Sequence, residues 1–387
     1  MKDKRELRVA YVTTYDARVP ANWSGTGYFM WKALQGDGIE VDLMGPLADS
    51  LSRLWEAKTR LYRGVLGRQY ERERQPWLQR HYARQVHDRL AAGHYDAIVS
   101  PGTIPIARLR TRIPTVFWTD STFAGMVDFY PAFTGLASET IRRGNEGEQT
   151  ALDRCSLAIY ASEWAAGTAR DRYRVDESKL RVVPLGANLE HDPAPDQVAA
   201  SINRRPIDEC RLLFVGVDWH RKGGDVAVAV TGELIRRGIA ATLTVVGVRP
   251  PADSPAFVEY AGYIDKGRPD DAARYDALLA GSHFLIVPSR AEAYGLVYAE
   301  ASAFGVPSLA TRVGGVSTVV SDGVNGFLFE PGAPPWRFAD IVASHHAAPD
   351  RYRSLAHQAA EEYRRRLNWA VAGQSVRTLL LGLSRPG

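Results

Sequence analysis

The sequence predicts an α/β fold with two Rossmann-like, parallel-sheet domains, and three observations support this prediction. The chain has 387 residues, more than one ordinary hydrophobic core accommodates. Short β-branched runs alternate with helical patterns, as in parallel sheets that carry helices on both faces. A polar, proline-bearing segment, residues 188–209, separates two sets of these runs and has the composition of a linker.

The domain boundary is therefore predicted near Pro193, which gives an N-terminal domain of residues 1–193 and a C-terminal domain of residues 194–366. The last segment, residues 367–387, is amphipathic and is expected to form a helix that packs on either domain and could complete the first. The predicted strands lie within residues 8–15, 41–45, 95–102, 114–121, 157–163 and 182–187, then 211–218, 241–247, 284–289, 307–311 and 326–330.

Net charge, cysteine spacing and the length of the apolar runs exclude several classes of protein. The net charge of +4 favours anionic ligands weakly, and it is far from the dense cationic surface of a nucleic-acid binder. Cys155 and Cys210 are far apart and have no metal-ligand spacing, so neither a zinc site nor a disulfide framework is expected. The start of the chain reads as a strand and not as a signal peptide, and no run reaches the length of a membrane span. We expect a cytoplasmic protein whose membrane contact, if any, is peripheral.

Residues 51–90 are helical in character and rich in arginine, with leucine, tryptophan and tyrosine interspersed. Two interpretations are open. The segment can be a pair of surface helices. It can also be an interfacial patch that meets an anionic, lipid-linked acceptor at the inner face of a membrane.

The first chemical motif is a loop followed by an apolar helix. Glu292 stands in the loop, Gly295 is a plausible helix entry, and residues 296–304 are expected to be helical. The backbone N–H groups of Gly295, Leu296 and Val297 would then lie at the positive end of a helix, where a diphosphate binds favourably.

Glu300 lies within this apolar helix. Its two carboxylate oxygens can accept hydrogen bonds from neighbouring hydroxyls such as those of a ribose, and a buried carboxylate without such partners is costly. The alternative is an ordinary solvated glutamate, and the apolar residues around it leave little polar surface for that interpretation.

The second motif follows the strand at residues 211–218. Arg221 and Lys222 lie in a turn, and Gly223 and Gly224 open the next helix. A cationic pair at this place can neutralise the charge that develops on a departing diphosphate. The alternative is an exposed basic turn.

Together these residues resemble the family-four retaining glycosyltransferases over roughly residues 181–330. The matching elements are Gly216 with Lys222-Gly223, the pair Glu292 and Glu300, Gly305-Val306-Pro307, Gly314-Gly315, and residues 322–327. The resemblance implies a GT-B fold, in which two Rossmann-like domains face each other across a deep cleft.

The same resemblance implies roles for single residues. Glu300 would bind the donor ribose and Lys222 the diphosphate, while Glu292 and the backbone amides of Ala293, Tyr294, Gly295 and Leu296 would bind the transferred sugar and phosphates. The family is metal-independent, so no cofactor beyond the nucleotide diphosphate sugar is expected. Many members carry Arg where this chain has Val217, so Arg221 is expected to supply the second cation.

The N-terminal half resembles the family less closely. Ser24, Gly25, Thr26 and Gly27 precede a predicted helix, like the family's glycine-rich loop, where small residues let the chain approach sugar or phosphate closely. Gly25, Thr26 and Gly27 are therefore expected to contribute to donor binding. No GxGxxG with an acidic partner is present, which disfavours a dehydrogenase.

Where many members have a histidine after the fourth strand, this chain has Asp120. We expect Asp120 to bind the donor sugar or to cap the helix that follows it.

The expected function is therefore transfer of a hexose-type sugar, with retention of configuration, from a UDP- or GDP-sugar to a glycan, glycolipid or small-molecule acceptor. The donor would bind first, the domains would close, and no protein nucleophile would be used. Two alternatives stay open: a nucleotide-sugar epimerase of GT-B fold, and a non-catalytic subunit that binds nucleotide sugars. The sequence contains no Walker loop and no G-x-S-x-G elbow, and its histidines show no metal-ligand spacing.

Overall fold

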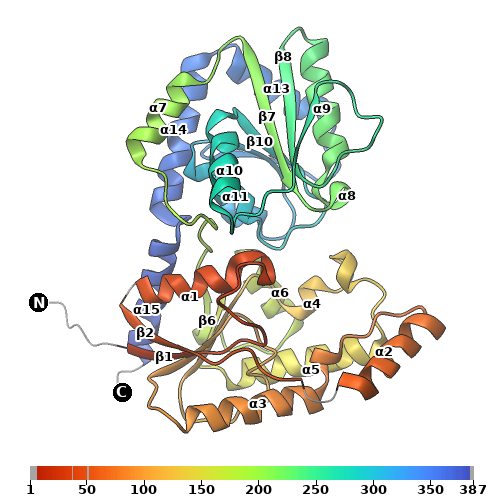
Figure 1. Ribbon diagram of the computed structural model, residues 1–387, viewed down its shortest axis with the longest axis vertical. Helices are drawn as coiled ribbons and strands as arrows, with labels where there is room; N and C mark the ends of the chain where they lie inside the picture. Colours follow the sequence, from red (N-terminus) through yellow and green to blue (C-terminus); the bar gives the residue numbers. More distant parts are fainter. Residues whose placement is uncertain (1–6, 37, 50–51, 384–387) are drawn as a thin grey trace, which may run out of the picture. The chain divides into compact units, whose positions relative to one another are not determined.

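The computed structural model describes residues 7–36, 38–49 and 52–383. Three predicted segments lie partly outside the described residues. These parts are residues 1–6 at the start of the chain, residue 51 of the helical segment 51–90, and residues 384–387 of the last segment. The chain divides into two units, shown in Figure 1. Unit 1 contains the described residues up to Pro184 together with the C-terminal helix α15 (Trp369–Leu383), and unit 2 contains Leu185–Asn368.

The division lies earlier in the chain than the Pro193 predicted from the sequence. The last strand of unit 1 ends at Val182, and Pro184 has no N–H to donate to a further strand pairing. The segment that follows is bonded within unit 2, because the Tyr294 hydroxyl donates to the Leu185 carbonyl at 2.7 Å and the Ala187 N–H donates to the Leu367 carbonyl at 2.9 Å. These bonds join residues far apart in sequence, so no local pattern marked them.

Unit 1 is built on a six-stranded parallel sheet of order β2-β1-β3-β4-β5-β6. Its central strands are buried on both faces, which explains their nearly continuous apolar sequence. The strands are β1 (Leu7–Tyr11), β2 (Ile39–Leu43), β3 (Ala97–Ser100), β4 (Thr115–Thr119), β5 (Leu157–Tyr160) and β6 (Leu180–Val182).

Helices cover both faces of this sheet. α1 (Thr26–Gly36) packs against α15, and Trp369 of α15 meets Trp118 of β4 edge to face. The opposite face carries a core formed with α3 (Pro76–Leu90), α5 (Ser138–Arg154) and α6 (Glu163–Arg172). The remaining helices of unit 1 are α2 (Ser52–Val65), α4 (Phe123–Met126), η1 (Asn22–Gly25), η2 (Arg72–Arg74), η3 (Pro131–Phe133) and η4 (Glu177–Lys179).

The helical prediction for residues 51–90 is confirmed, but the two helices differ. α3 is part of the core, since Leu78, Tyr82 and Val86 are buried. The described side chains of α2 and the residues after it lie mostly on the surface, and Val65 is 72% exposed. Only the α2 portion therefore fits the interpretation as a surface segment.

Unit 2 is built on a second six-stranded parallel sheet, of order β12-β11-β10-β7-β8-β9. The sequence did not predict β9, because this edge strand is half exposed and its alternating pattern is short. The strands are β7 (Glu209–Gly216), β8 (Ala240–Gly247), β9 (Val258–Gly262), β10 (Phe284–Val287), β11 (Ser308–Thr311) and β12 (Gly326–Phe329).

The predicted linker of residues 188–209 contains a packed helix, α7 (Pro195–Arg204), so the linker prediction is wrong there. Val198 and Ile202 are one turn apart and buried against α14, and Pro195 is well suited to the first helical position. The remaining helices of unit 2 are α8 (Trp219–Lys222), α9 (Gly224–Arg236), α10 (Pro269–Gly281), α11 (Leu296–Ala303), α12 (Val316–Val319), α13 (Pro335–His346) and α14 (Pro349–Arg366).

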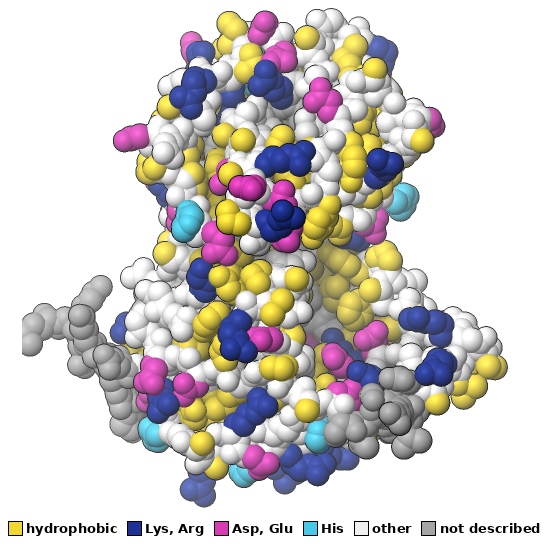
Figure 2. Space-filling view, in the orientation of Figure 1, with side chains coloured by type: hydrophobic (Ala, Val, Ile, Leu, Met, Phe, Trp, Pro, Cys, Tyr) yellow, Lys and Arg dark blue, Asp and Glu magenta, His cyan; other side chains and the backbone are white. Residues whose placement is uncertain are grey.

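Charged groups of both signs are spread over the face shown in Figure 2, where basic side chains lie among acidic ones on each unit. Within the described part of the chain, no helix has the length and apolar character needed to cross a membrane. Among the same residues, no three His, Cys, Asp or Glu side chains are placed to hold a metal ion. Both cysteines are buried and free.

Candidate functional site

The predicted donor residues gather where the strand order of unit 2 changes direction. β7 pairs with β10 on one side and with β8 on the other, so the chain leaves the carboxyl ends of β7 and β10 in different directions. In open parallel sheets this point leaves a crevice in which ligands bind. Lys222 follows β7 and Glu292 follows β10, so the topology brings these side chains to the same edge.

A tight turn after β7 presents Lys222. The carboxylate of Asp218 accepts the backbone N–H of Arg221 at 2.9 Å and caps the short helix α8. Gly223 ends that helix at φ 78°, and a Cβ there would lie 2.3 Å from the Pro288 carbonyl. Gly216 also has a steric role, since its Cβ would lie 2.8 Å from Cγ of Lys222. The glycines of the motif therefore let the turn approach Pro288, which follows β10, and leave room for the Lys222 side chain.

Glu292 binds both cations of the motif. Its carboxylate accepts a hydrogen bond from Nζ of Lys222, and Nη1 of Arg221 lies 3.7 Å from the same oxygen, Oε2. The Ser289 hydroxyl donates to Oε2 at 3.2 Å. Glu292 is only 6% exposed, and burial alone would raise the pKa of its carboxyl. Lys222 and Arg221 outweigh burial and lower this pKa, so the group is a buried anion between two cations.

The predicted helix entry is confirmed at Gly295, which adopts φ 91° and precedes α11. A side chain at this position would clash with the Tyr298 ring, because its Cβ would lie 2.4 Å from the ring. The first N–H groups of any helix lack partners within the helix, and those of Leu296 and Val297 lie at the positive end of α11. Ala293, like the other residues of this entry, can contribute its backbone.

The prediction for Tyr294 concerns its backbone amide, and its side chain has a structural contact of its own. The ring is buried, and its hydroxyl donates to the Leu185 carbonyl at 2.7 Å. The side chain anchors the segment that begins unit 2.

Glu300 is buried in α11 and is not the solvated glutamate of the alternative interpretation. It is 3% exposed, its Oε1 accepts from Nζ of Lys266 at 2.5 Å, and its Oε2 accepts from the Tyr275 hydroxyl at 2.7 Å. Sequence reasoning missed both partners. Lys266 stands in a polar loop and Tyr275 in α10, and nothing in their local pattern indicates that they meet a glutamate of a later helix.

In unit 1 the predicted glycine-rich loop lies after β1, next to the point where that sheet changes direction. Residues 23–25 all have positive φ, and α1 begins at Thr26, so Gly27 lies inside the helix and not before it. Gly27 leaves room for a tyrosine, because its Cβ would lie 2.1 Å from the Tyr15 hydroxyl oxygen. The Tyr11 hydroxyl binds the Gly27 carbonyl at 2.8 Å.

Asp120 follows β4, also at the carboxyl edge of its sheet. The helix-cap interpretation of Asp120 is wrong, because the Thr122 hydroxyl caps α4 by accepting the Gly125 N–H at 3.0 Å. The Asp120 carboxylate accepts from the Ser121 hydroxyl at 3.2 Å. The pKa of Tyr15 is raised by burial and then by the negative charge of Asp120, which indicates that these two groups are neighbours.

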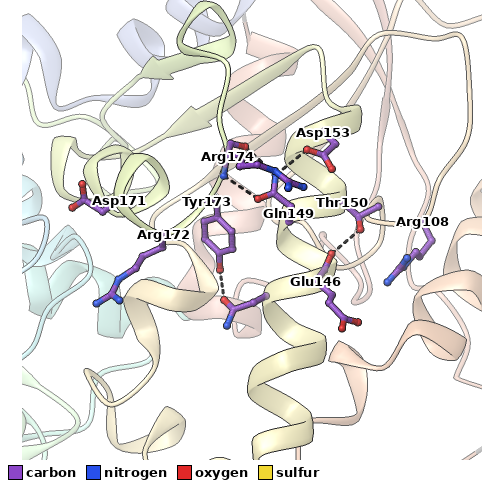
Figure 3. Close-up of a pocket in the computed structure, with 10 residues that line it drawn as sticks. Arg108, Glu146, Gln149, Thr150, Asp153, Asp171, Arg172, Tyr173 and Arg174 are labelled. Carbon is purple, nitrogen blue, oxygen red and sulfur yellow. Dashed lines mark hydrogen bonds between the residues drawn. The ribbon is translucent and has the colours of Figure 1, made fainter.

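A solvent-open hollow in unit 1 lies between α5 and the end of α6 and holds none of the predicted residues (Figure 3). Its polar groups bind one another: the Tyr173 hydroxyl donates to Asn145 at 2.6 Å, and the Gln149 amide donates to Asp153 at 2.8 Å. The full lining is Arg108, Asn145, Glu146, Gln149, Thr150, Asp153, Asp171, Arg172, Tyr173 and Arg174.

Comparisons with solved structures identify the fold. Sucrose-phosphate synthase from Thermosynechococcus elongatus covers 98% of this chain and 99% of its own, with a TM-score of 0.68 and 20% identity. The Anabaena protein HepE, solved in complex with UDP and glucose, covers 97% and 100%, with a TM-score of 0.62 and 15% identity. WaaG, a glycosyltransferase involved in lipopolysaccharide biosynthesis, covers 97% of this chain and 100% of its own, with a TM-score of 0.61 and 16% identity. The fold is GT-B.

Comparisons of sequence identify the family. Residues 209–346 match the family described as Glycosyl transferases group 1, and residues 28–191 match Glycosyltransferase Family 4. A D-inositol 3-phosphate glycosyltransferase of Segniliparus rotundus is 32% identical over 240 residues, which are 59% of this chain and 53% of the relative. Its counterpart in Nocardia farcinica is 30% identical over 281 residues, 68% of this chain and 61% of the relative. The match thus spans little more than half of each relative's length. With both halves matched, the chain belongs to the family-four, group 1 glycosyltransferases.

Proposed function

We propose that this protein transfers a hexose-type sugar, with retention of configuration, from a nucleotide diphosphate sugar to a hydroxyl acceptor. The observation that carries the proposal is the pairing of Lys222 and Arg221 with buried Glu292 beside the N-terminus of α11. A diphosphate that leaves a sugar gains negative charge, and fixed cations and helix N–H groups stabilise such charge in the transition state.

In this proposal each residue has one task. Lys222 and Arg221 hold the leaving diphosphate, Glu292 with the amides of the α11 entry orients the sugar and phosphates, and Glu300 binds the ribose. The acceptor enters on the face from which the diphosphate leaves, and a phosphate oxygen takes the acceptor proton. No protein nucleophile and no metal is required. Asp120 of unit 1 is proposed as a ligand of the donor sugar.

A UDP-sugar is the donor we favour over a GDP-sugar. HepE, which has the same fold, was solved with UDP and with UDP-glucose. The acceptor class stays broad: a glycan, a glycolipid or a small molecule. Because the relatives are named D-inositol 3-phosphate glycosyltransferases, that compound belongs among the acceptors to be tested.

We also propose that the protein is cytoplasmic and makes peripheral contact with an anionic membrane through α2. Leu61 and Val65 are one turn apart and are 54% and 72% exposed, with exposed Arg60 and Arg63 beside them. Sedimentation with phosphatidylglycerol vesicles should remove the protein from solution, and phosphatidylcholine vesicles should not. A Leu61→Asp, Val65→Asp variant that still sediments would contradict this contact.

The main test is calorimetric titration of the protein with UDP, GDP, ADP and their sugars in the presence of EDTA. We expect one nucleotide to bind, and we expect Lys222→Ala and Glu300→Ala to weaken that binding by about tenfold or more. If no nucleotide binds, or if both variants bind like the parent, the proposed donor site is wrong.

Product analysis separates the alternatives. A transferase forms a new glycoside only when acceptor is present, and it retains the anomeric configuration of the donor. An epimerase would change the donor sugar without acceptor, and a binding subunit would bind the donor without turnover.

A further inference from the structure

We infer that Lys266 is a positioning residue of the donor site, one that fixes the Glu300 carboxylate in the orientation that receives the ribose. The inference rests on the proposed role of Glu300. Lys266 does not belong to either motif recognised in the sequence, and it lies in the loop between β9 and α10.

Three contacts fix the position of the Lys266 ammonium group. Its Nζ donates to Oε1 of Glu300 at 2.5 Å and to the backbone carbonyl of Asn188 at 3.2 Å. It also lies 5.3 Å from the centre of the Tyr275 ring, whose hydroxyl holds the other oxygen of Glu300. Lysine and tyrosine thus hold one oxygen each, which prevents the carboxylate from rotating.

This arrangement leaves acceptor capacity for a ligand. A carboxylate has about four lone-pair positions, and Lys266 and Tyr275 occupy one on each oxygen. The second position on each oxygen can accept a hydroxyl, so two adjacent ribose hydroxyls can bind without displacing either partner. A carboxylate free to rotate would have to be ordered during binding, which weakens affinity.

The surroundings of Glu300 make the lysine necessary. Asp276 of α10 is a second acid near Glu300, and its pKa is raised by burial and then by the charge of Glu300, while Lys266 opposes that rise. His191 also lowers the pKa of Asp276, and the pKa of Tyr363 in α14 is raised by burial, by Asp192 and then by the charge of Glu300. Without Lys266, two acidic groups would face each other with less compensation, and Glu300 would be repelled from its present position.

Lys266 is partly exposed to solvent, so it holds Glu300 at a place that solvent can reach. The Lys266 side chain is 37% exposed, whereas the Lys222 side chain is 11% exposed. Lys266 therefore lies at the rim of the site, where it holds Glu300 from the solvent side.

The test compares UDP with 2′,3′-dideoxyuridine diphosphate, which lacks both ribose hydroxyls. We expect Lys266→Met to weaken UDP binding about tenfold, the effect of losing one hydrogen bond to a charged group, and to leave binding of the dideoxy nucleotide within about twofold. Lys266→Arg should restore part of the UDP affinity. Turnover at saturating donor should change little, so that KM rises while kcat is kept.

Two controls make the result specific. Arg268→Met removes a positive charge from an exposed position of the same loop and should leave UDP binding unchanged. In a Glu300→Gln background, Lys266→Met should have almost no further effect. The inference would be overturned if Lys266→Met weakened the binding of UDP and of the dideoxy nucleotide equally. It would also be overturned if Lys266→Met weakened UDP binding as strongly in the Glu300→Gln background as in the parent, because Lys266 would then act through the phosphates.

UDP binding by the parent protein and by two variants distinguishes an error about Lys266 from an error about the donor site. If Lys222→Ala weakens UDP binding and Lys266→Met does not, the donor site stands and only the role of Lys266 is wrong. If the parent protein binds no nucleotide, both are wrong.

Discussion

The carboxyl edges of the two parallel sheets are built in different ways. In unit 2 this edge holds two buried glutamates, each bound by a lysine: Glu292 by Lys222 and Glu300 by Lys266. In unit 1 the corresponding edge carries a glycine turn and Asp120, and α5 behind the sheet contributes one buried glutamate, Glu148. The edge of unit 2 is therefore organised by charge and that of unit 1 mainly by backbone and small residues.

Glu148 shows the difference most directly. The Thr103 hydroxyl donates to the Glu148 carboxylate at 2.6 Å, whereas Nη1 of Arg74 lies 3.8 Å from the same oxygen. Burial therefore raises the pKa of the Glu148 carboxyl above its usual value. Glu292, similarly buried, has its pKa lowered because two cations outweigh burial. One fold thus shifts the pKa values of two buried glutamates in opposite directions. Of these two glutamates, Glu292 is the one that lies beside two cations, as the proposed diphosphate site requires.

The largest effect is expected from Lys222→Met. This change removes the cation closest to Glu292 and leaves that carboxylate buried with Arg221 alone. We expect turnover to fall by about 10³-fold, as for the loss of a strong electrostatic stabiliser of a transition state. Arg353→Met, which breaks an exposed pair with Asp350, is the control and should retain full activity. Turnover within about threefold of the parent would remove Lys222 from the mechanism.

Glutamine substitutions test the contrast between the two glutamates. At pH 7, Glu292→Gln should lower the free energy of unfolding by about 3 kcal/mol, because it leaves two partly buried cations without their anion. Glu148→Gln should change it by about 1 kcal/mol or less, because a neutral amide replaces a group that burial already disfavours as an anion.

The pH dependence of stability should distinguish the same pair. The lowered pKa of Glu292 stabilises the fold above the unfolded pKa of about 4.3, and this contribution is lost as the pH falls below that value. The raised pKa of Glu148 has the opposite effect on stability. Its stabilising contribution is present below about pH 4.3 and decreases as the pH rises above that value. Denaturant unfolding from pH 4 to pH 8 should show Glu148→Gln gaining stability relative to the parent as the pH rises. Parallel profiles for the two variants would contradict the assignment.

The contrast also explains what the sequence could predict. Central strands and the Gly295 helix entry follow from local patterns, since β-branched runs and a glycine before an apolar helix each have a physical cause within a few residues. The partners of Glu300 are different. Lys266 lies 34 residues away and reads locally as a loop charge, so only the sheet topology brings it to the glutamate. The exposed edge strand β9 and the helix α7 were missed because their apolar patterns are short.

A smaller effect is expected from Asp120→Asn in unit 1. If unit 1 contributes a ligand of the transferred sugar and unit 2 binds the nucleotide, this change should lower kcat about tenfold and leave UDP affinity unchanged. Calorimetry with UDP and initial rates with the sugar donor separate the two quantities. A large loss of UDP affinity would contradict the division of tasks between the two edges.

The smallest effects are expected from one alanine at each edge. Gly216→Ala places a Cβ 2.8 Å from Cγ of Lys222, a flexible side chain that can shift away from its position beside Glu292. Gly27→Ala places a Cβ 2.1 Å from the Tyr15 hydroxyl oxygen, so the phenol ring must move within unit 1. Displacements of this size in packed surroundings cost about 1 kcal/mol or more, equivalent to roughly fivefold in an equilibrium constant. We therefore expect Gly216→Ala to weaken UDP binding about fivefold, and Gly27→Ala to leave it unchanged while lowering transfer to acceptor. Calorimetry and rate measurements on both variants, with thermal unfolding to confirm that each is folded, would show whether the nucleotide depends on unit 2 alone.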